Sequence, residues 1–525
     1  MLSSPHAWVM TPIGEDPGVR VSYDSHDVAP RTDPHPTGAL LLADLAAAAP
    51  SAEVRGDSAV RVTDVTYRSG DVTPGALFFC VRGDHVDGHD FAGAAAGAGA
   101  VAVVVEREVP VRCAQVVVPS VREAMGPMSA AFFGNPSERF PVVGVTGTNG
   151  KTTTTYLLEA VFDAAGETSG VIGTTGVRIA GEHVPFDRTT PEACDLQRVF
   201  ARMAASGVRA ATMEVSSHGL DQHRVDGTRY ACALFTNLSQ DHLDYHGTME
   251  AYFQAKARLF TAGLSGAGAI NVDTLEGERL ASMSTVPTTT FGIRNAGADV
   301  VATGVALDGS GLSFRVDGLV IRSGLRGPYN AMNCLGAVVA ARVLGLSDEA
   351  IARGIEGLAG VPGRLEAVDA GQPFTVVVDY AHTPDSLENV LRAVRELASG
   401  GRVIVVFGCG GDRDRGKRPQ MGRLATELAD LSVITSDNPR SEDPLAIIEQ
   451  VREGAEAGGG SFAVEPDRRS AIGLAIGEAR PGDVVVIAGK GHETGQQFAD
   501  RTIPFDDREV VREELEARGP AGRRT

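Results

Sequence analysis

Residues 144–153 read GVTGTNGKTT, and the fold prediction starts from this stretch. An apolar run at 140–144 leads into the glycines, and a helical pattern at 154–165 follows them. A strand, a glycine-rich loop and a helix in this order form a mononucleotide-binding unit, whose backbone N–H groups and helix N-terminus cradle phosphate oxygens. Lys151 is expected to reach the β- and γ-phosphates, and Thr152 to bind Mg²⁺. We therefore predict a P-loop here. The alternative, a glycine turn without a ligand, is disfavoured by the flanking strand and helix.

The remainder of the chain also alternates strands with helices. Its 525 residues are too many for one hydrophobic core, since domains average about 150 residues. The alternation predicts an α/β fold with mostly parallel sheets and ligands at the C-terminal ends of the strands. Thr383 is expected to cap a helix that starts at Pro384. The predicted units are a disordered extension (1–37), a small N-terminal α/β domain (38–139), a central P-loop domain with a parallel sheet (140–364), a C-terminal Rossmann-like domain (365–517) and a tail (518–525).

Composition excludes several classes of protein. The net charge of -19 would repel a phosphate backbone, so no nucleic-acid partner is expected. The six cysteines include no C-x-x-C pair, which argues against a zinc ribbon or a disulfide framework. The most apolar early run, 38–49, is short and contains Asp44, so neither a signal peptide nor a membrane span is expected. We expect a cytoplasmic monomer.

Polar side chains follow two strands of the central region. Glu214 ends an apolar strand, where a ligand for a hard cation is expected; a surface glutamate is the alternative. The next strand runs into the stretch NLSQDHLDYH at 237–246. Its two histidines and two aspartates fit a metal site or a polar network, but zinc is disfavoured because no cysteine accompanies them.

A second glycine-rich stretch, GCGGDR at 408–413, follows a strand of the C-terminal region. A dinucleotide fingerprint would need glycine at position 413, where this chain has arginine, so a nicotinamide cofactor is not expected. Arg413, and Arg440 in the stretch DNPR, suit a carboxylate ligand because a guanidinium donates two parallel hydrogen bonds. Surface salt bridges are the alternative for either arginine alone.

Together and in this order, these stretches resemble the Mur ligase family. The resemblance covers nearly everything after residue 38 and is closest to the members that add diaminopimelate in peptidoglycan precursor synthesis. Val145, where a strict P-loop has glycine, is similar to the loop of Mur ligases and folylpolyglutamate synthases and makes a kinase or switch GTPase less expected. The matching stretches are TGTNGKTTT (146–154), TTP (189–191), EVSSHGL (214–220), QHR (222–224), DHLDYHG (241–247), PYNAMN (328–333), GVPGRLE (360–366), DYAHTPDSL (379–387), GCGGDRDRGKRP (408–419), DNPR (437–440) and GKGHE (489–493).

The resemblance implies an ATP and Mg²⁺ site between two domains. Lys256 would be an ordinary helix-surface lysine by pattern alone, whereas the family implies that CO₂ carbamylates it and that the product helps bind a second Mg²⁺ beside His242. The implied catalytic residues are Lys151, Glu214, His242 and Lys256, and the implied metal ligands are Thr152, Glu214, His242 and Lys256. The implied ATP contacts are Gly147, Thr148, Asn149, Gly150, Lys151, Thr152, Thr153, Asn330, Asn333, Arg364 and Asp379.

The resemblance also implies two further substrates, a UDP-muramoyl-dipeptide and meso-diaminopimelate. Its members distinguish diaminopimelate from lysine by a distal carboxylate, with Glu493 pairing the distal ammonium. The implied dipeptide and uridine contacts are Ser69, Asp84, His85, Thr189, Thr190, Ser216, Gln222 and Arg224. The implied diaminopimelate contacts are Arg413, Asp437, Asn438, Pro439, Arg440, Gly489 and Glu493.

The implied reaction has two steps. The γ-carboxylate of D-glutamate takes the terminal phosphoryl group of ATP, with Lys151 and Mg²⁺ offsetting charge, and the amine of diaminopimelate then displaces phosphate. His218 could move protons, but the sequence does not identify the base. Because the nucleotide site and the amino-acid site are expected on different domains, we predict closure of the C-terminal domain before chemistry. The alternatives are a lysine-adding or folate-polyglutamylating ligase, and a nucleotide-binding scaffold without catalysis.

Overall fold

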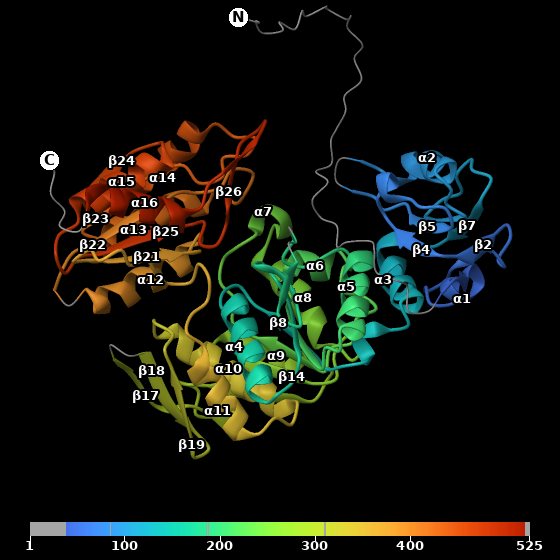
Figure 1. Cartoon of the computed structure of the whole chain (residues 1–525), viewed down its shortest axis with the longest axis horizontal. Helices are drawn as coiled ribbons and strands as arrows, with labels where there is room; N and C mark the ends of the chain where they lie inside the picture. The colour runs from blue at the N-terminus through green and yellow to red at the C-terminus, as the bar shows by residue number, and fades with distance from the viewer. Residues whose placement is uncertain are drawn as a thin grey trace, which may run out of the picture.

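A computed structural model describes residues 38–83, 86–184, 186, 188–308, 311–398 and 400–519 of the chain. The expected extension at 1–37, most of the expected tail, and Asp84 and His85 lie outside these ranges. Figure 1 shows three separate bodies: an N-terminal one at the right, a central one below, and a C-terminal one at the upper left. Within the described ranges, no helix is long and apolar enough to cross a membrane.

The N-terminal body is a five-stranded sheet in the order β2-β7-β6-β5-β4. The strands β4 to β7 run parallel, and β2 is antiparallel to β7. The helix α3 continues the chain toward the central body and packs with α1 beneath the sheet. The bounds are β2 Glu53–Arg55, β4 Asp64–Thr66, β5 Ala76–Phe79, β6 Ala102–Val105, β7 Ala114–Val117, α1 Leu42–Ala46, α2 Ala92–Gly97 and α3 Val121–Phe132.

The central body is built on a nine-stranded sheet in the order β11-β10-β9-β12-β8-β13-β14-β15-β16. The seven strands from β9 to β16 in this order pair in parallel, and β10 and β11 extend the edge as a hairpin. The bounds are β8 Val142–Thr146, β9 Ser169–Gly173, β10 Gly176–Ile179, β11 Glu182–Val184, β12 Ala210–Glu214, β13 Cys232–Phe235, β14 Gly268–Asn271, β15 Thr288–Gly292 and β16 Val300–Val301.

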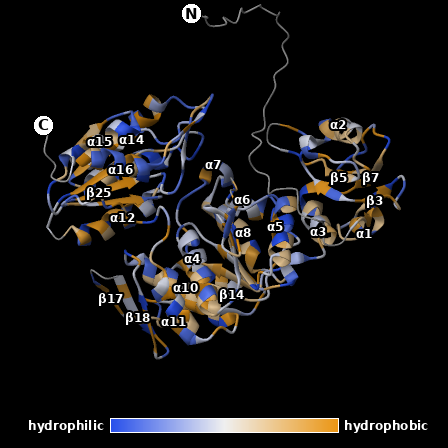
Figure 2. Ribbon diagram, in the orientation of Figure 1, coloured by the Kyte–Doolittle hydropathy of each residue, from blue (hydrophilic) through white to orange (hydrophobic). Residues whose placement is uncertain are grey.

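Helices cover both faces of the central sheet. The helices α4 (Lys151–Ala164), α10 (Tyr329–Val343) and α11 (Asp348–Gly357) pack on one face, and α5 (Ala193–Ala205) and α8 (Met249–Ala257) pack on the other. Because both faces are covered, the strands carry mostly apolar residues, as parallel strands in α/β proteins usually do. Figure 2 shows hydrophobic colouring at β14 and at the helix α10 beside it. A three-stranded antiparallel sheet, β17 (Thr303–Asp308), β18 (Gly311–Val316) and β19 (Leu319–Ser323), is appended next to α11.

The C-terminal body is a six-stranded sheet in the order β20-β21-β25-β22-β23-β24, parallel except for β20. The prediction for α12 (Pro384–Leu397) is confirmed, since Thr383 caps it, Pro384 is its first residue, and Ser386 completes a capping box. Helices α12, α13 and α14 pack on one face, and α15 and α16 on the other. The remaining bounds are β20 Glu366–Ala367, β21 Thr375–Asp379, β22 Val403–Phe407, β23 Leu431–Ile434, β24 Phe462–Val464, β25 Val484–Ala488, α13 Lys417–Leu428, α14 Pro444–Gly458, α15 Arg468–Glu478 and α16 Asp507–Arg518.

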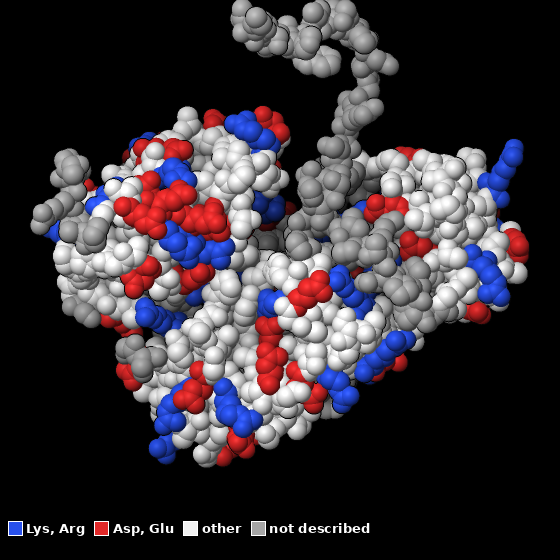
Figure 3. Space-filling model, viewed as in Figure 1, with Lys and Arg blue, Asp and Glu red and all other residues white. Residues whose placement is uncertain are grey.

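Charged side chains of both signs are mixed over the surface. On the face seen in Figure 3, acidic side chains gather on the C-terminal body, and basic side chains lie among them and elsewhere without forming one broad patch.

Candidate active site

The loop between β8 and α4 needs its glycines. Gly147 has a φ of 146° and Gly150 a φ of 88°, values that side chains rarely allow. A Cβ at Gly150 would lie 2.3 Å from Oδ1 of Asn333. Asn333 donates a hydrogen bond to Oδ1 of Asn330 at 2.8 Å. The fold thus places Asn330 and Asn333 of α10 directly against the loop.

Two buried lysines converge on the same loop. Lys151 Nζ donates to the carbonyl oxygens of Gly147 (3.0 Å) and Thr148 (2.8 Å), and Lys256 Nζ donates to that of Gly147 at 2.8 Å. Burial lowers the pKa of both amines, and the charge of Lys151 lowers the pKa of Lys256 further. Lys256 is only 2% exposed, so the alternative of a helix-surface lysine is wrong.

Glu214 is buried beside the first turn of α4. Its Oε1 accepts hydrogen bonds from Thr152 Oγ1 (3.0 Å) and from the backbone N of Thr174 (2.9 Å). Arg364 Nη2 donates to Thr152 Oγ1 at 2.9 Å, and Arg364 Nε has no hydrogen-bond partner within the described ranges. A carboxylate and a hydroxyl beside a P-loop are the oxygen donors that Mg²⁺ prefers, so Thr152 and Glu214 fit this ion. Arg364 Nε is available to a phosphate oxygen.

The histidines after β12 and β13 form an aromatic cluster in which the rings of His218 and His242 meet edge to face. The ring centroid of His218 lies 4.7 Å from that of His242 and 4.2 Å from that of Tyr245. Burial lowers the pKa of His218 to about 4 and that of His242 to about 3, although Asp241 opposes the shift of His242. Both rings are therefore uncharged near neutral pH. Of the described residues, no three His, Cys, Asp or Glu side chains form a metal-binding group.

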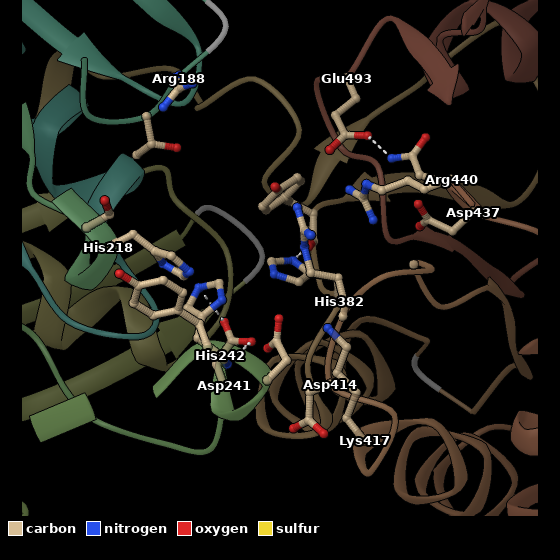
Figure 4. Close-up of a pocket in the computed structure, with 18 of the residues that line it drawn as sticks. Arg188, His218, Asp241, His242, His382, Asp414, Lys417, Asp437, Arg440 and Glu493 are labelled. Atoms are coloured by element: carbon tan, nitrogen blue, oxygen red, sulfur yellow. Dashed lines mark hydrogen bonds and ion pairs between the residues drawn. The ribbon is translucent and has the colours of Figure 1, made fainter. Parts of the chain in front are cut away.

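A cavity of about 570 Å³ lies between the central and C-terminal bodies. Figure 4 shows side chains from both bodies pointing into it. Of the sequence-predicted residues, it brings together Thr189, Thr190, Ser216, Gln222, Arg224 and His242 on the central wall, and Arg413, Asp437, Asn438, Arg440, Gly489 and Glu493 on the C-terminal wall. It does not include Ser69, which lies in a short 3₁₀ helix of the N-terminal body (Ser69–Asp71), or Pro439.

On the central wall, Thr190 links the strand end to the cavity. Its Oγ1 donates to the carbonyl of Glu214 and accepts from the backbone N of Ser216, both at 3.0 Å. Arg224 donates to the carbonyl of Thr190 (3.2 Å) and to Oε1 of Gln222 (2.6 Å). These five residues, Thr190 and four from the segment 214–224, therefore form one hydrogen-bonded unit.

A charged cluster that the sequence did not reveal borders this wall. The carboxylate of Glu192 lies 3.1 Å from Arg224 Nε, 3.0 Å from Arg188 Nη1 and 3.2 Å from Arg122 Nη1. Arg122 comes from α3, so the cluster joins the N-terminal body to the cavity. Three guanidiniums around one carboxylate leave a surplus of positive charge here, which favours anionic ligands.

On the C-terminal wall, buried ion pairs hold the predicted residues. Lys490, which is fully buried, donates to Asn438 Oδ1 and to Glu493 Oε2, both at 3.0 Å. Asn438 Nδ2 donates to the same Oε2 at 2.8 Å, so the other oxygen of Glu493 is free of these two bonds. Burial alone would raise the pKa of Asp437, but the cations around it, Lys490 first, hold it below its usual value.

Asp379 holds the segment between the two bodies. Its Oδ2 accepts from the backbone N of Leu365 at 2.7 Å, and its Oδ1 accepts from that of Ala381 at 2.8 Å. The guanidinium of Arg364 lies 4.7 Å from the ring centre of Tyr380. Asp379 therefore fixes the residue that follows Arg364, whose side chain reaches the P-loop.

The two bodies also touch directly at the P-loop. Asp385, in the first turn of α12, accepts from Asn149 Nδ2 at 2.6 Å and from Ser239 Oγ at 3.2 Å. His492 Nε2 lies 3.1 Å from the carbonyl oxygen of Thr174. These contacts connect the nucleotide loop to the body that carries the residues predicted to contact diaminopimelate.

Several cavity residues received no role from the sequence. They are Arg188, Asp241, Asp244, Tyr245, Tyr380, His382, Gly410, Asp414 and Lys417. All but Arg188 fall within the stretches DHLDYHG, DYAHTPDSL and GCGGDRDRGKRP. Their position in the sequence could have marked them as cavity residues, since each stretch follows the carboxyl end of a parallel strand.

Comparison with known proteins gives a consistent result. Family models match residues 61–133 (Mur ligase family, catalytic domain), 145–341 (Mur ligase middle domain) and 363–491 (Mur ligase, glutamate ligase domain). A UDP-N-acetylmuramoyl-L-alanyl-D-glutamate–2,6-diaminopimelate ligase of Geobacillus thermodenitrificans is 49% identical over 462 residues, 86% of this chain and 94% of that protein. A solved structure of a ligase of the same description is 33% identical, with a TM-score of 0.65 over 91% of this chain and 99% of that one. The MurF ligase from Thermotoga maritima in complex with ADP, 19% identical with a TM-score of 0.62 over 87% of this chain and 98% of that one, shares the fold.

Proposed function

Because this chain belongs to the Mur ligase family, we propose that it is an ATP-dependent ligase that joins meso-diaminopimelate to the γ-carboxylate of D-glutamate in UDP-N-acetylmuramoyl-L-alanyl-D-glutamate. The observation that carries the proposal is the cavity between the two bodies. One wall is linked to the P-loop, because Thr190 donates to the carbonyl of Glu214 and the Glu214 side chain accepts from Thr152, and the other wall presents two arginines and a glutamate. This arrangement suits an amino acid with two carboxylates and two amines.

In the first step, the chain would bind ATP and orient the carboxylate. Gly147 to Thr153, Asn330 and Asn333 surround the phosphates, and Lys151 and Arg364 offset their charge. Mg²⁺, held by Thr152 and Glu214, would neutralise phosphate charge when bound. The γ-carboxylate oxygen bonds to the γ-phosphorus as the bond to ADP breaks, which leaves an acyl phosphate.

Lys256 suits the carbamylation that the family resemblance implies. CO₂ reacts with a neutral amine, and burial beside Lys151 favours the neutral form of Lys256. The carbamate would place an anion beside His242, where it could serve as a further Mg²⁺ ligand. A mass increase on Lys256 in native mass spectrometry, lost on acidification, would support this assignment.

In the second step, an uncharged amine of diaminopimelate attacks the acyl carbon. Thr189, Thr190, Ser216, Gln222 and Arg224 would hold the dipeptide on the central wall, and Ser69, with Asp84 and His85 outside the described ranges, the uridine. Neutral His218 is suited to accept the proton that the amine loses. Arg364 and Asp379 would contact ATP from the junction of the two bodies, and Asp379 would also position Arg364 through its bond to Leu365.

The amino-acid end of the cavity would select diaminopimelate over lysine. Arg413 and Arg440 bind carboxylates, whereas Glu493 pairs with the distal ammonium, and Asp437, Asn438, Pro439 and Gly489 shape the wall. Lysine lacks the distal carboxylate, so it would leave an arginine without its partner.

A phosphate-release assay tests the proposal. The protein is mixed with Mg-ATP, the UDP-muramoyl-dipeptide and, in separate samples, meso-diaminopimelate, L-lysine or L-glutamate. We expect release only with diaminopimelate, together with a product of the tripeptide mass. Release with lysine or glutamate would reassign the substrate, and no release with any of them would support a scaffold without catalysis. We further propose that the protein acts as a monomer in the cytoplasm, where ATP is available, since one chain supplies both walls of the cavity.

A further inference from the structure

Lysine is rare in this chain. Of its 48 basic residues, only Lys151, Lys256, Lys417 and Lys490 are lysines, and all others are arginines. All four are buried or half-buried, and all lie beside the nucleotide loop or the cavity. A chain that uses arginine at every other basic position retains lysine only here, where a compact ammonium and a planar guanidinium are not interchangeable. The proposed function assigns Lys151 to phosphate binding and Lys256 to carbamylation. Lys490 donates hydrogen bonds to Asn438 and Glu493.

Lys417 is the lysine without a structural explanation. It is 5% exposed and lines the cavity, and Figure 4 shows its side chain extending into the cavity from the C-terminal side. No hydrogen bond or ion pair joins it to any residue in the ranges that the structure describes. Its neighbour Arg418 is also buried but pairs with Glu442 at 2.8 Å. Burial of a cation that makes no hydrogen bond costs free energy, and the charge of Asp241, which lies near enough for Lys417 to lower its pKa, offsets part of this cost.

Its place in the helix adds to this cost. Lys417 is the first residue of the 12-residue helix α13, whose N-terminus already carries partial positive charge and disfavours a cation. Both features suit an anion that enters the cavity, since it would meet the helix N-terminus and the ammonium together.

Lys417 also lies on the side of the cavity that faces the nucleotide. Burial and then the charge of Lys417 lower the pKa of His382 to about 4, so the two groups are close. Figure 4 places Asp241 and His242 of the central wall across from them. Arg440 and Glu493, which would bind the amino acid, lie farther along the same wall.

We propose that Lys417 is a catalytic residue that binds the phosphoryl oxygens of the acyl phosphate and of the phosphate that leaves it, an inference that rests on the proposed function. As the amine nitrogen bonds to the acyl carbon, the carbonyl electrons move to oxygen. These electrons re-form the carbonyl group as the bond from carbon to the phosphate oxygen breaks, and phosphate departs with the electron pair of the broken bond. The nitrogen loses its proton to a base. Lys417 stays protonated throughout and donates hydrogen bonds to the growing charge on phosphate.

The test compares Lys417→Met and Lys417→Arg with the wild type, with Arg423→Met on the exposed side of α13 as control. At saturating substrates we expect Lys417→Met to lower kcat for phosphate release about a hundredfold, with KM for diaminopimelate within about threefold. Lys417→Arg should recover part of kcat because it keeps the charge. The Tm of Lys417→Met should lie close to that of the wild type or above it, since no hydrogen bond or ion pair is lost with the buried charge.

A second measurement does not require diaminopimelate. Orthophosphate added to the protein with Mg-ADP should raise the Tm of the wild type and of Arg423→Met, but not that of Lys417→Met. Unchanged kcat, or a Tm several degrees lower in Lys417→Met, would show that Lys417 is a structural residue and overturn the proposal. If the wild type releases no phosphate with diaminopimelate, the proposed function fails, and the orthophosphate shift still decides whether Lys417 binds phosphate.

Discussion

The two walls of the cavity position their groups in different ways. On the central wall, the backbone does most of this: glycines shape the loop between β8 and α4, and Thr190, Ser216 and Glu214 are joined through backbone atoms. On the C-terminal wall, buried ion pairs hold the loops, among them Lys490 with Glu493 and Arg418 with Glu442. Damage to the central wall should therefore stop chemistry, whereas damage to the C-terminal wall, at residues other than Lys417, should weaken amino-acid binding and acid stability.

The largest expected effect is on the central wall. Lys151→Ala removes the amine that would neutralise the phosphates, so phosphate release should fall about a thousandfold or more. The measurement is the phosphate-release assay at saturating substrates. An exposed variant, Arg353→Ala, serves as control. Full turnover by Lys151→Ala would show that the loop does not bind a reacting triphosphate.

The next effect should separate binding from chemistry on the C-terminal wall. Arg440→Met removes a guanidinium from the cavity, and kcat/KM for diaminopimelate should fall about a hundredfold, mainly through KM. The preference over lysine should shrink because lysine lacks the distal carboxylate. Arg415→Met, in the same loop region but 68% exposed, should leave both values unchanged. Equal losses for diaminopimelate and lysine would mean that Arg440 does not recognise the distal carboxylate.

Lys490→Met should have a smaller effect of the same kind. Without its ammonium, Asn438 and Glu493 lose a shared partner and a fixed orientation, so KM for diaminopimelate should rise about tenfold while kcat changes little. Steady-state kinetics at several diaminopimelate concentrations measure the split. If KM for ATP rises as much, Lys490 supports the whole body rather than the amino-acid site.

The smallest effect concerns acid stability of the loop that carries Arg413. Hydrogen bonds from Arg418 lower the pKa of Glu442 to about 2 from 4.5. Because the folded-state pKa is the lower one, this contribution to stability is complete above about pH 4.5 and is lost as the pH falls toward 2. Glu442→Gln should therefore cost about 2 kcal/mol at pH 7, and the difference from the wild type should shrink below pH 4.

Thermal melts between pH 3 and pH 7 give this comparison. Glu449→Gln, which disrupts an exposed pair with Arg452, should change the Tm little at any pH in this range. A Glu442→Gln deficit that stays constant down to pH 3 would mean that the carboxylate charge is not what stabilises the loop.

Local signals in the sequence predicted much of this arrangement. The capped start of α12 and the strand, loop and helix at 140–165 were visible because caps and glycine loops depend on near neighbours. The predicted helix began at 154, whereas α4 begins at Lys151, since a P-loop passes directly into its helix. The burial of Lys256 could not be predicted from its pattern, because the loop at Gly147 that covers it is more than a hundred residues away in the sequence.

The sequence by itself determined the element order, the nucleotide loop, and the family to which the chain belongs, because these depend on short stretches in a fixed order. Only the tertiary structure decided that Glu192 gathers three arginines, that Asp385 reaches Asn149 across the bodies, and that Lys417 is buried in the cavity with no hydrogen bond or ion pair to the described part of the chain. Whether a charge is paired or alone depends on groups that come from distant parts of the chain, and no local pattern records that distance.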